Sequence, residues 1–315
     1  MKSKRIELHD EVKLSQVNEE NLKLLQRYKV DMVMRNLSEG TQKRYILDLQ
    51  QWFIWNLENQ GNKSVREMND DDITEFLYFC KSEGNNSERI KLRIAGISAF
   101  FKFLRKKRLI VENPTEFIDR PKRGMPVAVQ TFLTPEQVAL MREKLIDTQD
   151  IQLRLFAMLS LSTMARARAI ASIKWNQIDI EKKCIYGVLE KEGKIVDLYF
   201  SDEVKYLLVQ LKLLRESRLH SDYGWLFYTG RCTEDKHVSI STLNTWCKKI
   251  GQMIGVPTLH CHDFRHSGAT ILKNAGMPLE DVSVLLNHES TQTTKKYYIK
   301  EDTARISSLK GRYNI

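Results

Sequence analysis

The sequence predicts a mainly α-helical chain of the α+β class, with one small β-hairpin sheet and two domains. Its 315 residues are enough for two domains that each bury a hydrophobic core. Apolar residues recur at helical spacing along much of the chain, whereas residues 179–200 alternate as paired strands do, around a turn at Glu192 and Gly193. Residues 119–130 (DRPKRGMPVAVQ) contain two prolines, one glycine and three basic residues without a helical period, and therefore predict an interdomain linker.

Residues 21–118 are predicted to form the first, helical domain, and residues 1–20 a polar N-terminal tail. Ser38 has the side chain of a helix N-cap, and the residues after it place an apolar stripe on one helix face. N-cap residue types at 69–72 begin a second helix, and a third helix carries its own stripe. The three stripes consist of Tyr45, Leu49, Trp52 and Phe53, then Ile73, Phe76, Leu77 and Cys80, then Ile90, Ile94, Ile97 and Phe101.

Residues 131–315 are predicted to form the second domain. It opens with a capping box, in which Thr134 and Gln137 cap each other's backbone and Pro135 occupies the first helical position. A long apolar helix around residues 153–161 comes next, then the hairpin, and the rest of the domain has mostly helical periodicity.

The charge of the chain points to a polyanionic partner without proving one. The formal net charge is +10, and many basic proteins nevertheless never bind nucleic acid. Charged residues interrupt every apolar run before the roughly 20 residues that a membrane span needs. The N-terminus has no apolar segment of the kind found in secretory signals. We therefore expect a cytoplasmic protein with no membrane partner.

The five cysteines are scattered and form no CxxC pair, which is typical of reduced thiols in a cytosolic protein. His260, Cys261 and His262 are consecutive and resemble part of a metal site. No second cluster supplies the remaining ligands, so we expect no metal and interpret the triplet as a strand-to-helix junction.

Six residues form a set suited to phosphate chemistry. Two precede this junction, one lies in it and three follow it. His262 and Arg265 lie three apart, His288 and Tyr297 lie nine apart, and Arg166 and Lys191 precede them. Cleaving a phosphodiester without water or metal needs a nucleophile, positive donors for the transition state and an acid for the leaving oxygen. Arginine suits the second task because its planar fork contacts two phosphate oxygens and stays charged.

This ordered set resembles the active site of the tyrosine recombinases, the phage integrase family. Arg166 follows a threonine by three and precedes Ile173-Lys174-Trp175, as the first arginine of the family does, and Arg168 is the competing candidate. The residues His262 to Arg265 match the His-x-x-Arg box. In the Lys-x-Gly-Lys-like hairpin segment, Lys191 is favoured over Lys194 as the family's lysine. His288 takes the place of the second histidine, and Tyr297, ahead of the adjacent Tyr298, that of the nucleophile.

The resemblance implies a site-specific recombinase or integrase, which stores the strand's bond energy in a 3′-phosphotyrosyl link. It leaves open whether the enzyme belongs to a phage or other mobile element or to a chromosome-dimer system. Arg166 and Arg265 would clamp the scissile phosphate, His262 and His288 would add hydrogen bonds, and Lys191 would protonate the leaving group. No cofactor is implied. An N-terminal core-binding domain and the catalytic domain would close as a C-shaped clamp around double-stranded DNA, with four protomers on paired sites.

Four positions depart from the family pattern. Ala169 replaces a glutamate three residues after the first arginine, Gln177 replaces an acidic residue, and Asn287 and Met164 replace glycines. Asparagine tolerates the left-handed conformation that glycine often supplies. These departures keep a second hypothesis open: a catalytically inactive, sequence-specific DNA-binding regulator, acting as a monomer or dimer and repressing transcription. A helical protein-interaction scaffold would leave the ordered set unexplained.

Basic side chains of the first domain and linker are candidate DNA contacts, and a solvated surface stripe explains each equally well. The candidates are Lys43, Arg44, Arg89, Lys91, Arg93, Lys122 and Arg123. The segment after Tyr297 is expected to form a small helix that packs either on a neighbouring protomer or back on its own chain.

Overall fold

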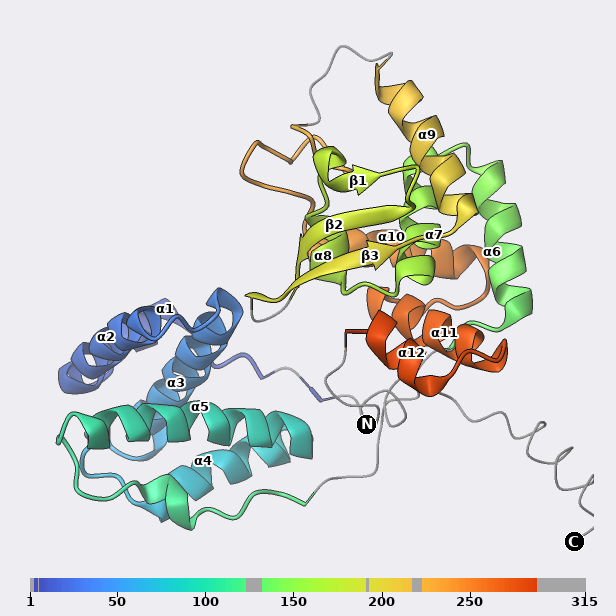
Figure 1. The fold of residues 1–315 in the computed structure, drawn as a ribbon. Coiled ribbons are helices and arrows are strands. Elements are labelled where there is room, and N and C mark those ends of the chain that lie inside the picture. The colour runs from blue at the N-terminus through green and yellow to red at the C-terminus, as the bar shows by residue number, and fades with distance from the viewer. Residues whose placement is uncertain (1–2, 5, 123–131, 191–192, 217–222, 288–315) are drawn as a thin grey trace, which may run out of the picture. The chain divides into compact units, whose positions relative to one another are not determined.

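The computed structural model describes residues 3–4, 6–122, 132–190, 193–216 and 223–287, which form two compact units (Figure 1). The first unit comprises residues 1–129 and the second 130–315. Each has a hydrophobic core of its own. The predicted class is confirmed, because the described chain is mainly helical with one small antiparallel sheet. That sheet has three strands, one more than the expected hairpin.

The first unit is a bundle of helices around an aromatic core. Predicted N-caps are confirmed: the side chains of Ser38 and Asn69 accept hydrogen bonds from the backbone N–H groups that begin α3 and α4. Tyr28, Trp52 and Phe101 are fully buried in its centre. The elements are α1 (Glu11–Gln16), α2 (Glu19–Met34), α3 (Glu39–Asn59), α4 (Asp70–Ser82), α5 (Ser87–Lys106) and the 3-10 turn η1 (Pro114–Phe117).

The segment expected to be a polar tail belongs to this unit instead. Asp10 caps α1, and the N–H of Lys4 donates to the carbonyl of Gly84 at 2.9 Å. Val17 is buried in the core, and Ile6, Leu8 and Leu14 pack against it. These apolar residues are too widely spaced to produce a helical period, which explains why the sequence pattern did not reveal the contact.

Arg93 is buried in the first unit, contrary to its expected place on a DNA-binding surface. Its Nε donates to Asn85 Oδ1 at 2.8 Å and its Nη2 to Gln51 Oε1 at 2.9 Å. Its Nη1 lies 3.5 Å from Asp48 Oδ1, and Arg89 forms two hydrogen bonds with the same carboxylate. The side chains of Arg93 and Asp48 are 2% and 1% exposed, so Arg93 holds α3, α5 and the α4–α5 connection together.

The second unit packs helices around a three-stranded sheet. The described elements are α6 (Pro135–Asp147), α7 (Ile151–Thr163), α8 (Ala167–Ala171), the 3-10 turn η2 (Trp175–Gln177), β1 (Ile178–Asp179), β2 (Cys184–Leu189), β3 (Ile195–Tyr199), α9 (Asp202–Glu216), α10 (Ile240–Met253), α11 (Cys261–Asn274) and α12 (Leu279–Leu285). The predicted capping box of Thr134 and Gln137 is confirmed at the start of α6. The strands run antiparallel in the order β1-β2-β3, with Ile185 opposite Leu198.

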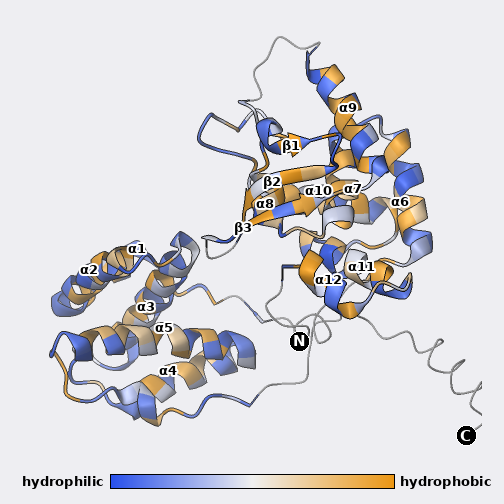
Figure 2. Cartoon of the chain, in the orientation of Figure 1, coloured by the Kyte–Doolittle hydropathy of each residue, from blue (hydrophilic) through white to orange (hydrophobic). Residues whose placement is uncertain are grey.

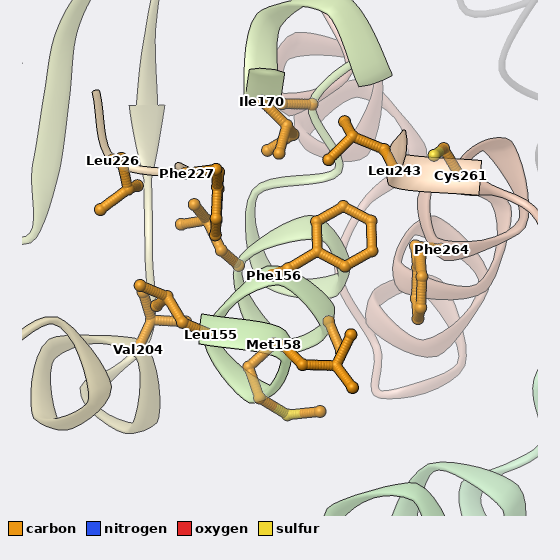
Figure 3. Packing of buried hydrophobic residues seen from close by; sticks show 14 of the residues in the cluster. Leu155, Phe156, Met158, Ile170, Val204, Leu226, Phe227, Leu243, Cys261 and Phe264 are labelled. Carbon is orange, nitrogen blue, oxygen red and sulfur yellow. The ribbon is translucent and has the colours of Figure 1, made fainter. Parts of the chain in front are cut away.

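Helix α7 forms the centre of the second core. Phe156 meets Phe227 and Phe264 edge to face, with ring centroids 5.9 and 6.0 Å apart (Figure 3). The surrounding helices carry hydrophobic stripes on one side and polar residues on the other (Figure 2). Packing of α7 against α9 and α11 therefore fixes the positions of the helix ends that carry the candidate site.

Within the described ranges, no helix is both long and apolar enough to cross a membrane.

Replacing Asp48 by asparagine should destabilise the first unit. The change removes the one negative charge between Arg89 and Arg93 in the described structure, and Arg93 then stays buried without its counter-charge. Breaking a buried ion pair from one side costs about 3–5 kcal/mol. Hydrogen exchange measured by mass spectrometry should show faster exchange in α3 and α5, with α7 unchanged as an internal reference.

Glu39→Gln is the matched control, because it removes a carboxylate on the same helix whose side chain is 87% exposed. It should leave exchange in α3 nearly unchanged. Equal exchange in Asp48→Asn and Glu39→Gln would show that the buried pair does not hold the bundle together.

Candidate active site

Arg166 is placed by an unusual turn between α7 and α8. Helix α7 ends at Thr163, and its C-cap residue Met164 has a φ of 53°, in the left-handed region where glycine is favoured. Arg166 is the N-cap residue of α8. Such a conformation costs a β-carbon-bearing residue roughly 1–2 kcal/mol. The side chain of Met164 is buried with Ala269, Val282 and Leu286, and this apolar burial offsets the strain.

Arg265 lies in α11 and is nearly inaccessible to solvent. Its Nη1 donates to the carbonyl of Met164 at 2.7 Å, and its Nη2 donates to the carbonyl of Leu286 at 2.5 Å. The residue after Leu286, Asn287, has a φ of 51° and so adopts the left-handed conformation that asparagine tolerates. The guanidinium thus joins α11 to two turns, each held by a left-handed residue in place of glycine.

Glu190 connects the two arginines. Its Oε2 accepts a hydrogen bond from Arg166 Nη1, and its Oε1 lies 4.0 Å from Arg265 Nη1. The Glu190 side chain is fully buried, whereas that of Arg166 is 31% exposed. Sequence reasoning missed this residue, although it directly precedes the predicted Lys191. The available signal was an acidic residue at the end of an otherwise apolar strand.

His262 lies in the first turn of α11, on the same helix as Arg265, and part of its surface is exposed. Its ring is 4.6 Å from that of His266, in an edge-to-face arrangement. Burial lowers the pKa of His262 to about 4, and the positive charge of Arg265 adds to the effect. The imidazole is therefore neutral at physiological pH and suited to hydrogen bonding rather than to carrying charge.

Position 177 has a glutamine where the family pattern described above has an acidic residue, and the structure explains this difference. Its Oε1 accepts from the N–H of Lys174 at 2.8 Å. Its Nε2 donates to the carbonyls of Tyr186 and Gly187 at 3.2 and 3.0 Å. A carboxylate accepts hydrogen bonds but donates none, so the amide is needed to join η2 to β2 here. Ala169, by contrast, is fully buried in α8 and supplies no polar atom to the arginines.

Three of the six predicted catalytic residues, Arg166, His262 and Arg265, lie within the described residues. Arg166 and Arg265 share Glu190, whereas the competing Arg168 is exposed. The other three, together with the DNA-contact candidate Arg123, lie outside the described residues: Lys191, His288 and Tyr297. The runner-up Lys194 is exposed, and its carbonyl accepts from the N–H of Glu190 at 2.8 Å.

The remaining candidate DNA contacts differ in their accessibility. The Lys43 side chain is 81% exposed, and Lys122 is also exposed. Arg44 is half-buried with its guanidinium over the ring of Tyr45, and Lys91 pairs with Glu88 at 2.9 Å. The guanidinium of Arg89 forms an ion pair with the carboxylate of Asp48. We therefore regard Lys43 and Lys122 as the most accessible of the set.

The chain contains no cluster of three or more metal-ligating side chains in the part that the structure describes. At the candidate triplet, the Sγ of Cys261 lies 3.5 Å from that of Cys247 in the core, and His260 Nδ1 lies 2.8 Å from Asp263 Oδ2. All five cysteines are free and buried, as expected of reduced thiols.

Replacing Gly268 by alanine should destabilise the second unit and disturb Arg265. A β-carbon at this position of α11 would lie 2.4 Å from the carbonyl oxygen of Leu161 and 2.7 Å from Met164 Cγ. Helix α11 must then move away from α7, at a cost of roughly 1–3 kcal/mol. Scanning calorimetry should show a lower Tm. Gly230→Ala is the control, since its β-carbon meets no atom within 4 Å, and equal Tm values for the two variants would contradict the close approach.

His266 should make the stability of the second unit depend on pH. Burial lowers its pKa to about 3, whereas an unfolded histidine titrates near 6.5. Between these values the unfolded chain binds a proton that the folded chain does not, so the free energy of unfolding falls as the pH falls. From pH 7.5 to pH 5 the loss is about 2 kcal/mol.

The contribution of His266 is measured by comparing wild-type protein with His266→Gln in urea unfolding at both pH values. The variant should lose less stability on acidification, because glutamine does not titrate. An identical loss in the two proteins would assign the pH dependence to other groups.

Comparison with known proteins places the chain in a family. The sequence model of the phage integrase family matches residues 131–305, and that of the phage integrase N-terminal SAM-like domain matches residues 25–108. The chain is 29% identical over 276 residues to the tyrosine recombinase XerC of Roseiflexus castenholzii, covering 84% of each chain. It is also 29% identical over 281 residues to XerC of Herpetosiphon aurantiacus, covering 86% of this chain and 89% of the relative.

Solved structures share the fold at lower identity. The XerH site-specific recombinase bound to a palindromic difH substrate aligns with a TM-score of 0.71 and 17% identity, over 99% of this chain and 92% of that one. The Tn1549 transposon integrase in complex with circular intermediate DNA aligns with a TM-score of 0.67 and 17% identity, over 90% and 98%. The match across residues 131–305, where Arg166, His262 and Arg265 lie, shows that the chain belongs to the phage integrase family of tyrosine recombinases.

Proposed function

We propose that this site-specific tyrosine recombinase cuts and rejoins double-stranded DNA through a phosphotyrosyl bond to Tyr297. The observation that carries the proposal is the pairing of Arg166 and Arg265 around one buried carboxylate. Arg265 lies on α11, the helix that also bears the neutral His262. Two guanidiniums against one carboxylate leave a local positive charge for a phosphate. The comparisons do not favour the alternative of an inactive DNA-binding regulator, because the relatives are named recombinases.

The described residues account for phosphate binding in this scheme. Arg265 is held by two carbonyls, so its guanidinium does not have to be ordered again when the phosphate arrives. The partly exposed Arg166 approaches the phosphate from the α7–α8 turn, and His262 adds a neutral hydrogen bond. A fixed positive arrangement of this kind stabilises the extra negative charge of a pentacoordinate phosphorus.

The residues outside the described ranges are assigned their roles by their positions in the family pattern. The phenolic oxygen of Tyr297 attacks phosphorus and the bond to the 5′-oxygen breaks. Lys191 gives its proton to that oxygen, and His288 adds a hydrogen bond to the phosphate. Attack by the 5′-hydroxyl of another strand, whose proton returns to Lys191, then releases Tyr297 and seals the DNA, so no ATP and no cofactor are consumed.

Strand exchange between two duplexes requires four cleavages, and we therefore propose a homotetramer on paired sites. The two units would close around DNA as a C-shaped clamp, with Lys43 and Lys122 on the backbone. In support, the related XerH and Tn1549 integrase structures are complexes with DNA. Five free, buried thiols suit a reducing cytoplasm.

Covalent trapping tests the function. Duplexes selected for binding to this protein are nicked beside the site, so that the cut fragment diffuses away and cleavage becomes irreversible. The wild-type protein and Tyr298→Phe should give a protein–DNA adduct on a denaturing gel, and Tyr297→Phe should give none. An adduct that persists in Tyr297→Phe would reject this nucleophile. Tight binding without an adduct in any of the three proteins would support a regulator instead.

A further inference from the structure

We infer that Glu190 is a positioning residue, which holds the guanidiniums of Arg166 and Arg265 in the geometry that the scissile phosphate requires. It supplies the carboxylate that position 169, an alanine in this chain, does not provide. The inference rests on the proposed function of the arginines. It concerns a residue outside the six of the catalytic pattern.

The burial of Glu190 indicates that its carboxylate has a structural or functional role. Its side chain is fully buried at the end of the hairpin strand, although a glutamate would normally extend into solvent there. Removing a carboxylate from water is strongly unfavourable unless opposite charges and hydrogen bonds replace the solvent. Here one oxygen accepts from Arg166 Nη1 and the other lies 4.0 Å from Arg265 Nη1. The carboxylate therefore lies between two cations.

The two arginines depend on Glu190 to different degrees. Arg265 also donates to the carbonyls of Met164 and Leu286, so two backbone groups already hold it. Arg166 is 31% exposed, and Glu190 is its only ion-pair partner within the described residues. A long side chain gains rotamer entropy when it is released. Loss of Glu190 should therefore mainly free Arg166.

Glu190 also links the arginines to the hairpin. Its N–H donates to the carbonyl of Lys194 at 2.8 Å, which closes the chain across the turn, while its carboxylate reaches Arg166. Lys191, the proposed acid, is the next residue in the sequence. Glu190 thus contacts the phosphate-binding Arg166 and directly precedes, in the sequence, the residue assigned as the acid.

Glu190→Gln tests the inference, because it keeps the size of the side chain and removes its charge. Single-turnover cleavage of the nicked duplex at saturating protein should slow by roughly 10–100-fold. Losses on this scale are seen when a residue that orients the ligand of a metal ion is removed. The Kd for uncleaved duplex should stay equal or become lower, since a negative charge near the phosphate is gone. A general loss of structure would raise the Kd as well.

The matched control is Glu181→Gln, which removes an 85% exposed carboxylate paired with Lys205 in the same unit. Its cleavage rate should equal that of the wild type. Faster cleavage by Glu190→Gln would overturn the inference, because Glu190 would then compete with the phosphate for the arginines. An unchanged rate would overturn it too.

A second measurement does not depend on cleavage and separates this inference from the proposed function. Phenylglyoxal modifies accessible guanidiniums, and mass spectrometry of the digested protein reports the rate at Arg166. In Glu190→Gln that rate should rise several-fold, while it stays at the wild-type value in Glu181→Gln. If Arg166 reacts equally in all three proteins, Glu190 does not position it, whether or not the wild-type protein forms an adduct on Tyr297.

Discussion

The two hydrogen bonds from Arg265 to backbone carbonyls are the interactions on which the candidate site depends. They join α11 to the turn after α7 and to the end of α12, and therefore bring three separated segments of the chain to one point. Both carbonyl oxygens lie at helix ends, where the backbone turns into the left-handed region at Met164 and Asn287. The packing of α7 against α11 supports this arrangement, and Gly268 in α11 allows the two helices to approach each other closely.

The departures from the family pattern are consistent with an intact site. Asn287 adopts the conformation for which a glycine is commonly used, and Met164 does the same while filling an apolar cluster. Gln177 donates two hydrogen bonds that an acidic residue would not make. The missing glutamate at position 169 is matched by a carboxylate that arrives from the hairpin, at Glu190.

The features that sequence analysis predicts well are those that depend on local chemistry. The caps at Ser38, Asn69 and Thr134 and the left-handed Asn287 follow from the properties of single residues, and each is present in the structure. Burial that depends on distant partners was not predictable in this way. Arg93 is buried because the carboxylate of Asp48, 45 residues away in the sequence, balances its positive charge. No local pattern in the sequence distinguishes it from a surface arginine.

The same limit applies to Glu190, whose partners come from two other helices. Strand β1 and helix α1 escaped prediction for a different reason, since two and six residues are too few to establish a period.

The enclosed Arg93 has a consequence for how strongly this chain responds to ionic strength. A protein that binds DNA releases one condensed counterion, approximately, for each phosphate that a basic side chain neutralises, and this release sets the slope of log K against log salt. An arginine sealed inside a helical bundle neutralises no phosphate and releases no ion. The count of 50 lysines and arginines therefore overstates the number of cations available to a duplex, and the salt sensitivity of binding should follow the accessible cations alone.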